Sequence, residues 1–229
     1  MNKWILNIET STKNCSVSLS CDGRLIDLIE KSDQNYTHGE RLHPFINKII
    51  ENSKINFSKL SAISVSKGPG SYTGLRIGVS AAKGLCYSLN IPLISLNSLS
   101  VLANKVKVSE GTLLAPMIDA RRMEVYTQIL DYNYKIVKNT WAELINKNSF
   151  KELMNQNDIL AFGIGSNKSI NIIKNPRYNV LHHEYEPSAK NMVENSYKKY
   201  LNKEFEDIAY FEPYYLKDFY NSSSKENLI

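Results

Sequence analysis

The glycine-rich stretch between Lys67 and Lys83 reads KGPGSYTGLRIGVSAAK. It follows an apolar run with strand character, residues 62–66, and opens a longer segment with helical periodicity. A glycine-rich turn between a strand and a helix is a common place for phosphate groups, because backbone N–H groups and the helix dipole point at the anion. The stretch therefore indicates an α/β protein and makes nucleotide binding one hypothesis.

A second pattern runs through the same residues. Gly70, Gly74, Gly78 and Ala82 recur every four positions, which places small residues along one face of a helix. Such a face lets another backbone approach closely, so a partner helix is the competing hypothesis. The stretch lacks the Gly-Lys-Ser/Thr ending of a Walker A loop, and its glycine spacing does not fit GxGxxG. Packing is therefore favoured over phosphate binding.

The bulk composition is that of an ordinary soluble globular protein of 229 residues, with 42% hydrophobic and 22% charged residues. The net charge of +5 permits contact with nucleic acid but does not argue for it, since no dense basic run interleaved with aromatics occurs. The three cysteines form no CxxC or zinc spacing and are expected to be reduced. No secretory leader or apolar run of about 18 residues is found, so a cytoplasmic protein without membrane contact is expected.

The order of elements is predicted to be βββαβαβα in each half of the chain. In the first half, strands are expected at residues 4–8, 16–20, 25–29, 62–66 and 92–95, and helices at 40–52, through the glycine-rich stretch to 89, and from 98. In the second half, strands are expected at 113–118, 125–130, 134–137, 159–162 and 180–181, and helices at 141–155, up to 174, and at 188–205. Two such α/β halves are the layout of actin-like ATPases and sugar kinases, which are built from RNase H-like lobes. We expect an N-terminal lobe, 1–104, and a C-terminal lobe, 105–229, whose last segment packs back.

Glu9, Thr10 and Ser11 follow the first strand and are candidate ligands of a nucleotide. A carboxylate with hydroxyls at the carboxyl end of a strand can orient Mg²⁺ and phosphate. The same residues also suit a turn in which hydroxyl side chains bond to neighbouring backbone groups. The sequence leaves both interpretations open.

A metal site built from the four histidines is not expected. His38 and His43 are five residues apart, which separates them by about 140° around a helix. His182 and His183 are adjacent, and adjacent side chains point to opposite faces of a strand. No Gly-x-Ser-x-Gly elbow or Cys/His pair supports a nucleophilic mechanism.

Four motifs together resemble the TsaB (YeaZ) family. They are 8–11 (IETS), 68–78 (GPGSYTGLRIG), 119–126 (DARRMEVY) and 213–217 (PYYLK). The resemblance implies a non-catalytic paralogue and partner of TsaD, the enzyme that transfers threonylcarbamoyl to N6 of adenosine 37 in tRNAs reading ANN codons. It also implies that TsaE, an ATPase, binds to the TsaB–TsaD pair, and that tRNA is reached only indirectly.

Departures from the TsaD pattern imply that the chain has no catalytic residue, metal or cofactor of its own. Lys13 and Asn14 stand where TsaD has an Asp and a Glu after the first strand. Ser98 and Leu102 stand where it has two metal-binding histidines. The carboxylate and hydroxyls after the first strand would then be the vestige of a cofactor site.

The family pattern implies an interface formed by the glycine-rich helix and the helix at 40–52. These helices would bundle with TsaD, or with a second copy of the chain when TsaD is absent. The residues expected at this interface are Gly70, Thr73, Gly74, Leu75, Ile77, Gly78, Ala81, Ala82, Leu42, Phe45 and Ile49. Alternatives are an active ATP-dependent phosphotransferase or ATPase of the actin-like class, a metallopeptidase-like protein, and a homodimeric binding module without a tRNA role. The roles of Arg121, Arg122 and Lys217 stay open.

Overall fold

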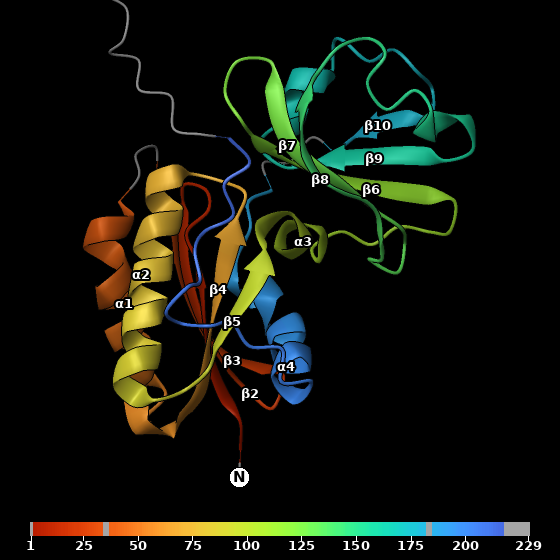
Figure 1. Ribbon diagram of the computed structural model, residues 1–229. Coiled ribbons are helices and arrows are strands. Elements are labelled where there is room, and N and C mark those ends of the chain that lie inside the picture. Colours follow the sequence, from red (N-terminus) through yellow and green to blue (C-terminus); the bar gives the residue numbers. More distant parts are fainter. Residues whose placement is uncertain (1, 34–36, 182–184, 218–229) are drawn as a thin grey trace, which may run out of the picture.

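Two five-stranded sheets, one from each half of the chain, organise the molecule (Figure 1). The computed structural model describes residues 2–33, 37–181 and 185–217. The first sheet has the strand order β3-β2-β1-β4-β5, and the second has the order β10-β9-β6-β7-β8. In both sheets the first three strands in sequence pair antiparallel and the remaining pairs are parallel. The two halves thus share the strand arrangement that the repeated sequence pattern predicts.

The strands of the first sheet are β1 (Trp4–Glu9), β2 (Asn14–Cys21), β3 (Arg24–Ser32), β4 (Leu60–Gly68) and β5 (Leu93–Asn97). Those of the second sheet are β6 (Thr112–Asp119), β7 (Glu124–Leu130), β8 (Ile136–Leu144), β9 (Asp158–Phe162) and β10 (Tyr178–Val180). The α-helices are α1 (His38–Asn52), α2 (Tyr72–Leu89), α3 (Ser98–Ala103) and α4 (Val193–Leu201). Short 3-10 helices are η1 (Phe57–Lys59), η2 (Leu153–Asn155), η3 (Ser166–Ser169) and η4 (Ala189–Met192).

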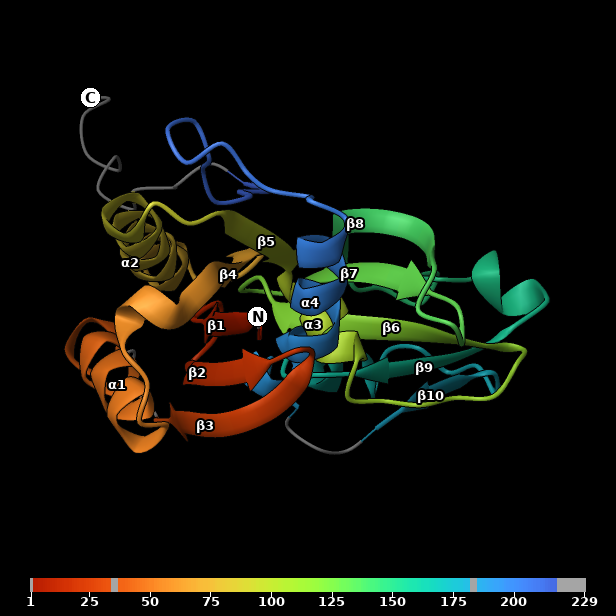
Figure 2. The ribbon, with the colours of Figure 1, turned by 90° about the horizontal axis from the view of Figure 1, so that it is seen from below.

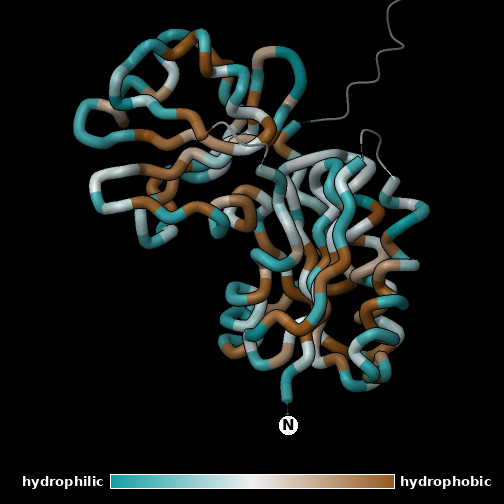
Figure 3. The backbone as a smooth tube through the Cα atoms, turned by 180° about the vertical axis from the view of Figure 1, so that it is seen from behind, coloured by the Kyte–Doolittle hydropathy of each residue, from teal (hydrophilic) through white to brown (hydrophobic). Residues whose placement is uncertain are grey.

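Helices cover both faces of the first sheet (Figure 2). α1 and α2 pack on one face, against β2 and β4, and α4 packs on the other, against β1 and β5. The buried positions of α1 include Leu42, Ile46, Ile49 and Ile50, which recur at helical spacing and face the sheet. Hydrophobic residues concentrate along the central strands of this sheet (Figure 3). No helix in the described ranges is both long and apolar enough to cross a membrane.

The prediction of a helix at 141–155 is wrong. Its first residues belong to β8, and only the 3-10 helix η2 follows. Phe150 has a φ of 63°, in the left-handed region, which a right-handed helix cannot contain. This conformation places its ring between those of Trp141 and Tyr178, with centroid distances of 6.1 and 6.0 Å. Aromatic packing against the second sheet therefore replaces the predicted helix.

Two further helices are shorter than expected. The helix predicted up to residue 174 is only η3, where Ser166 donates a hydrogen bond to the Gly163 carbonyl and Ser169 donates one to the Ser166 carbonyl. Serine side chains that bond to nearby backbone in this way compete with helix formation. The helix predicted at 188–205 divides into η4 and α4.

The C-terminal part of the chain returns to the first sheet. After α4, residues 206–217 form what we call the C-terminal strap, which passes β5 and β4 on its way to the second sheet. The Glu206 amide donates to the Leu93 carbonyl over 2.9 Å, and the Tyr214 amide donates to the Lys67 carbonyl over 2.7 Å. A lobe boundary between residues 104 and 105 remains a prediction.

Candidate functional site

The turn between β1 and β2, residues 10–13, packs directly onto the glycine face of α2. The Thr10 hydroxyl donates to the Gly74 carbonyl over 2.8 Å, and the Ser71 amide donates to the Ser11 carbonyl over 2.7 Å. A Cβ atom on Gly74 would lie 2.2 Å from the Thr10 carbonyl oxygen, and one on Gly78 would lie 2.2 Å from the Thr10 hydroxyl. The spacing of small residues therefore serves a contact inside the chain.

This geometry corrects the expectation that the glycine face receives a second protein. Seven of the residues expected at the interface are buried within the chain: Gly74, Leu75, Gly78, Ala81, Ala82, Leu42 and Ile49. A Cβ on Gly70 would lie 2.3 Å from the Ser11 carbonyl oxygen, so this position is also filled. Thr73 is exposed, and Phe45 and Ile77 are half-buried. Besides Ala81, which borders the outward side of α2, only these last three side chains reach the outer surface of the two helices.

The predicted nucleotide ligands are used internally. Glu9 is fully buried and accepts a hydrogen bond from the Ser11 amide over 2.7 Å. Burial raises the pKa of this carboxyl, although hydrogen bonds from Ser11 and Ser66 act in the opposite direction. Full burial also keeps this carboxyl out of contact with Mg²⁺ in solvent. The Thr10 hydroxyl is already committed to α2, so the cluster fits a structural turn better than a phosphate site.

The histidines do not form a metal site among the described residues. His38 is buried and its Nε2 donates to the Thr12 carbonyl over 2.7 Å, whereas His43 is exposed on α1. His182 and His183 lie outside the described residues. Within the described part of the chain, no three His, Cys, Asp or Glu side chains gather as metal ligands.

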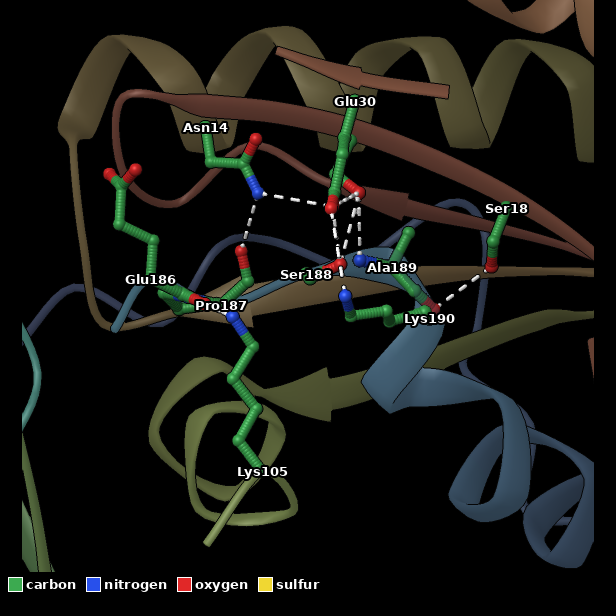
Figure 4. A network of polar contacts seen from close by, with 10 residues as sticks. Asn14, Ser18, Glu30, Lys105, Glu186, Pro187, Ser188, Ala189 and Lys190 are labelled. Atoms are coloured by element: carbon green, nitrogen blue, oxygen red, sulfur yellow. Dashed lines mark hydrogen bonds and ion pairs between the residues drawn. The ribbon is translucent and has the colours of Figure 1, made fainter. Parts of the chain in front are cut away.

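The space beside β2 is occupied by residues 185–189, which come back from the second sheet and which we call the return segment (Figure 4). Asn14 donates from its amide to the Pro187 carbonyl over 3.0 Å, and the Ser18 hydroxyl donates to the Ala189 carbonyl over 2.9 Å. The Ala189 amide in turn donates to the Ser16 hydroxyl over 2.9 Å. Asn14, which stands in place of an acid of the TsaD pattern, thus binds a backbone carbonyl instead of a metal or phosphate.

The Glu30 carboxylate accepts the remaining hydrogen bonds of this network. Burial raises the pKa of its carboxyl, but hydrogen bonds from Ser188, Ser16 and Asn14, together with the charge of Lys190, outweigh burial and lower it. This serine network was not predicted from the sequence. The serines at alternate positions of β2 were a signal, because they place hydroxyls on one face of the strand.

The two positions that the resemblance matches to metal-binding histidines lie in the interior. Ser98 and Leu102 are fully buried on α3, and Leu102 belongs to an apolar cluster that includes Leu114 and Phe162 of the second sheet. A Cβ on Gly163 would lie 2.7 Å from a Leu102 methyl carbon. These residues therefore pack α3 against the second sheet.

The outward side of α2 is open and forms a shallow groove with α1, which we call the outer groove. Its volume is about 560 Å³, and its lining comprises His43, Arg76, Ile77, Ser80, Ala81, Gly84, Leu85 and Ser88. Among the described residues, no atom outside the adjoining turns of α2 lies within 4 Å of a Cβ placed on Gly84. Ser80, Gly84 and Ser88 recur every four residues on this side, a second small series that the sequence analysis overlooked.

The C-terminal strap holds the basic residues of α2. Arg76 donates to the Tyr215 hydroxyl over 3.2 Å, and its guanidinium lies 4.2 Å from the centre of the Tyr72 ring. The rings of Tyr72 and Tyr215 are 4.6 Å apart. Lys83 donates to the Phe211 carbonyl over 2.9 Å. The strap is therefore attached along α2 beside the outer groove.

Comparisons with known proteins identify a family and several relatives that this chain resembles. Residues 32–219 match the family described as TsaD: tRNA N6-adenosine threonylcarbamoyltransferase. The chain is 39% identical over 129 residues to tRNA threonylcarbamoyladenosine biosynthesis protein TsaB of Bacillus subtilis, covering 56% of this chain and 55% of that protein. It is 33% identical over 126 residues to the TsaB protein of Haemophilus influenzae, covering 55% and 52%. The chain thus spans about half the length of the curated relatives it matches.

One solved structure shares the fold over nearly the whole chain. It is an uncharacterized protein with similarity to peptidase YEAZ from Pseudomonas aeruginosa, with a TM-score of 0.82 and 23% identity, covering 94% of this chain and 100% of that one. The resemblance to TsaB (YeaZ) is confirmed. The predicted α/β fold, with two sheets of the same strand arrangement, is confirmed as well.

Proposed function

The chain belongs to the TsaD family of tRNA N6-adenosine threonylcarbamoyltransferases, and we propose that it acts there as a non-catalytic subunit that docks a TsaD-type transferase. The transferase would modify adenosine in tRNA, and a TsaE-type ATPase would join the pair. A second copy of the chain would occupy the same surface when the transferase is absent. The names of its relatives support a place in tRNA threonylcarbamoyladenosine biosynthesis, and the docking roles follow from the resemblance of its motifs to the TsaB family.

The absence of transfer chemistry is supported by how the chain uses its own polar groups. Thr10 is bonded to α2, Asn14 is bonded to the return segment, and Glu9 is buried with a raised pKa. Leu102 has no atom that can ligate a metal and lies in an apolar cluster.

The open outer groove is the single observation that carries the docking proposal. Gly84 and the adjacent serines leave room for a partner helix to approach the α2 backbone closely. Ile77 and Leu85 are half-buried at the groove, and Tyr87 nearby is 84% exposed. An apolar strip with small residues and an exposed aromatic side chain is typical of a protein interface.

Gly84→Leu tests the docking surface, because the new side chain enters open space and should leave the monomer folded. We expect it to abolish co-purification with a TsaD-type transferase from the same organism, and to abolish self-association in sedimentation analysis. Gly39→Leu is the matched control: Gly39 lies in α1, also has open space around it, and does not line the groove. Both changes raise helix propensity, so weaker helices cannot explain a loss of binding. Unchanged association of Gly84→Leu would refute the docking surface.

The pathway role needs a separate test. Deleting the gene and measuring threonylcarbamoyladenosine in bulk tRNA by mass spectrometry should show loss of the modified nucleoside. Complementation with the wild-type chain should restore it, and complementation with Gly84→Leu should not. Normal levels in the deletion strain would reject the role in tRNA modification.

A further inference from the structure

The hairpin between β6 and β7, residues 119–124, carries two arginines in an unusual backbone conformation. Arg121 and Arg122 have φ angles of 68° and 48°, which lie in the left-handed region. Glycine and asparagine adopt this region far more readily than arginine. Lys54 and Lys203 adopt the same region singly, whereas this hairpin places two adjacent charged side chains at one tip. We name residues 119–124 the arginine hairpin.

The acidic groups of the arginine hairpin are already neutralised by lysines. Asp119 forms an ion pair with Lys168 over 2.7 Å, and Glu124 forms one with Lys217. Both arginines are exposed, and no hydrogen bond or ion pair of either guanidinium is found within residues 2–33, 37–181 and 185–217. Two positive charges at the tip are therefore left without an anion from the described part of the chain.

The arginine hairpin lies close to the proposed docking helix but outside the outer groove. Lys217, the last residue of the C-terminal strap, forms the ion pair with Glu124 at the base of the hairpin. Tyr215, two residues earlier in the strap, stacks on Tyr72 and accepts a hydrogen bond from Arg76 of α2. Figure 1 shows the strap ending beside β7. None of the hairpin residues lines the groove, so a partner helix seated there leaves the arginines free.

We propose that Arg121 and Arg122 bind backbone phosphates of the RNA that the docked transferase modifies. Guanidinium groups bind phosphate in a bidentate manner and remain charged at all relevant pH values. The inference rests on the proposed function for the identity of the RNA, and it departs from the expectation that tRNA is reached only through the partner. An acidic protein surface is the competing ligand and becomes one outcome of the test.

The double variant Arg121→Gly/Arg122→Gly removes both charges and keeps the fold. Glycine accepts φ values of 68° and 48° without strain, so the hairpin should form at least as readily as in the wild type. The matched control is Lys54→Gly/Lys203→Gly. Lys54 and Lys203 are also exposed and also have left-handed φ values, 54° and 57°. They precede β4 and the strap, at the end of the first sheet opposite to the arginine hairpin.

Binding of an unmodified tRNA transcript that reads an ANN codon is measured as a function of salt, for the chain alone and with a TsaD-type transferase. The arginine variant should bind roughly ten-fold more weakly, and its log–log salt slope should fall by about two, one for each lost phosphate contact. The lysine control should behave as the wild type, and both variants should still co-purify with the transferase. Arg121→Lys/Arg122→Lys should retain part of the affinity.

Three outcomes overturn the proposal. In the first, the arginine variant and the wild type bind the RNA equally well, both alone and with the transferase. In the second, the wild type shows no measurable RNA affinity, either alone or with the transferase. The third is loss of transferase binding with unchanged RNA affinity, which assigns the hairpin to a protein contact. If the transferase does not bind the wild-type chain at all, the proposed function fails. The measurement on the chain alone then still decides the role of the arginines.

Discussion

The Thr10 hydroxyl donates a hydrogen bond to the Gly74 carbonyl over 2.8 Å and so joins the β1–β2 turn to the first turns of α2. The contact requires glycine, because a Cβ on residue 74 would lie 2.2 Å from the Thr10 carbonyl oxygen. The glycine spacing therefore holds the fold together. The docking surface proposed for a partner uses a different side of α2, where Gly84 faces open space.

Gly74→Ala is expected to lower the free energy of unfolding by about 2–4 kcal/mol, since the added methyl group must displace the backbone of the turn. Gly84→Ala is the control: it enters open space and should be neutral or stabilising by up to about 1 kcal/mol, because alanine favours helix. Urea denaturation of both variants measures the difference. Equal midpoints would mean that α2 can move away from the turn without cost, contrary to the packing described.

Glu9→Gln is expected to reduce the dependence of stability on pH. Burial raises the pKa of Glu9 above its ordinary value of 4.5, so the folded state prefers the protonated carboxyl. Its contribution to stability is complete below that value and is lost as the pH rises through the folded-state pKa. Glutamine has nearly the same shape and no ionisation, so the variant should unfold at a higher temperature than the wild type at neutral pH.

Thermal unfolding across the range from about pH 4 to 8 checks the Glu9 prediction. Glu143→Gln is a suitable control, because Glu143 is half-buried on β8 and outside the turn. Parallel profiles for Glu9→Gln and the wild type would show that Glu9 ionises in the folded protein as it does in the unfolded chain.

Asn14→Asp restores an acidic side chain after the first strand and is expected to destabilise the chain. The Asn14 amide donates to the Pro187 carbonyl over 3.0 Å and to a Glu30 carboxylate oxygen over 3.4 Å. An aspartate would face both acceptors with its own oxygens, at a cost of about 2–3 kcal/mol at neutral pH. The loss should shrink in acid, where the new carboxyl is protonated.

Lys13→Asp is the natural control for Asn14→Asp, because Lys13 is exposed in the same turn and its change should stay within about 0.5 kcal/mol. Urea titrations at neutral and acidic pH distinguish the two. If Asn14→Asp is as stable as Lys13→Asp, the return segment does not depend on the asparagine amide.

Sequence patterns predicted the first half of the chain well and the second half less well. The strands and helices of the first sheet have strong periodicity and clear glycine punctuation, and α1 begins and ends close to its predicted limits. Around Phe150 the apolar residues also have helical spacing, but Phe150 has a left-handed φ and its ring packs against other aromatic rings. Periodicity alone does not distinguish this turn from a helix. Contacts between residues far apart in the sequence determine whether such a segment forms a helix.

The candidate site shows the same limit. A four-residue series of small side chains marks a close approach but not which backbone approaches. On the Gly74 side the approaching backbone is the chain's own turn, whereas on the Gly84 side the surface is open. The network that ties Asn14 to Pro187 joins residues 173 positions apart, so no local pattern could have predicted it.

Calorimetry with Mg-ATP is expected to show no binding to the isolated chain. Two of the groups that would cradle phosphate are occupied, because Thr10 bonds to α2 and the amide of Asn14 bonds to the return segment. Ser16 and Ser18 likewise bond to Ala189. A nucleotide would have to displace these contacts before it could make its own, which leaves little net affinity. A TsaD-type transferase measured alongside serves as the reference. Saturable heat from the isolated chain, abolished by Thr10→Val, would instead support the phosphotransferase or ATPase alternative.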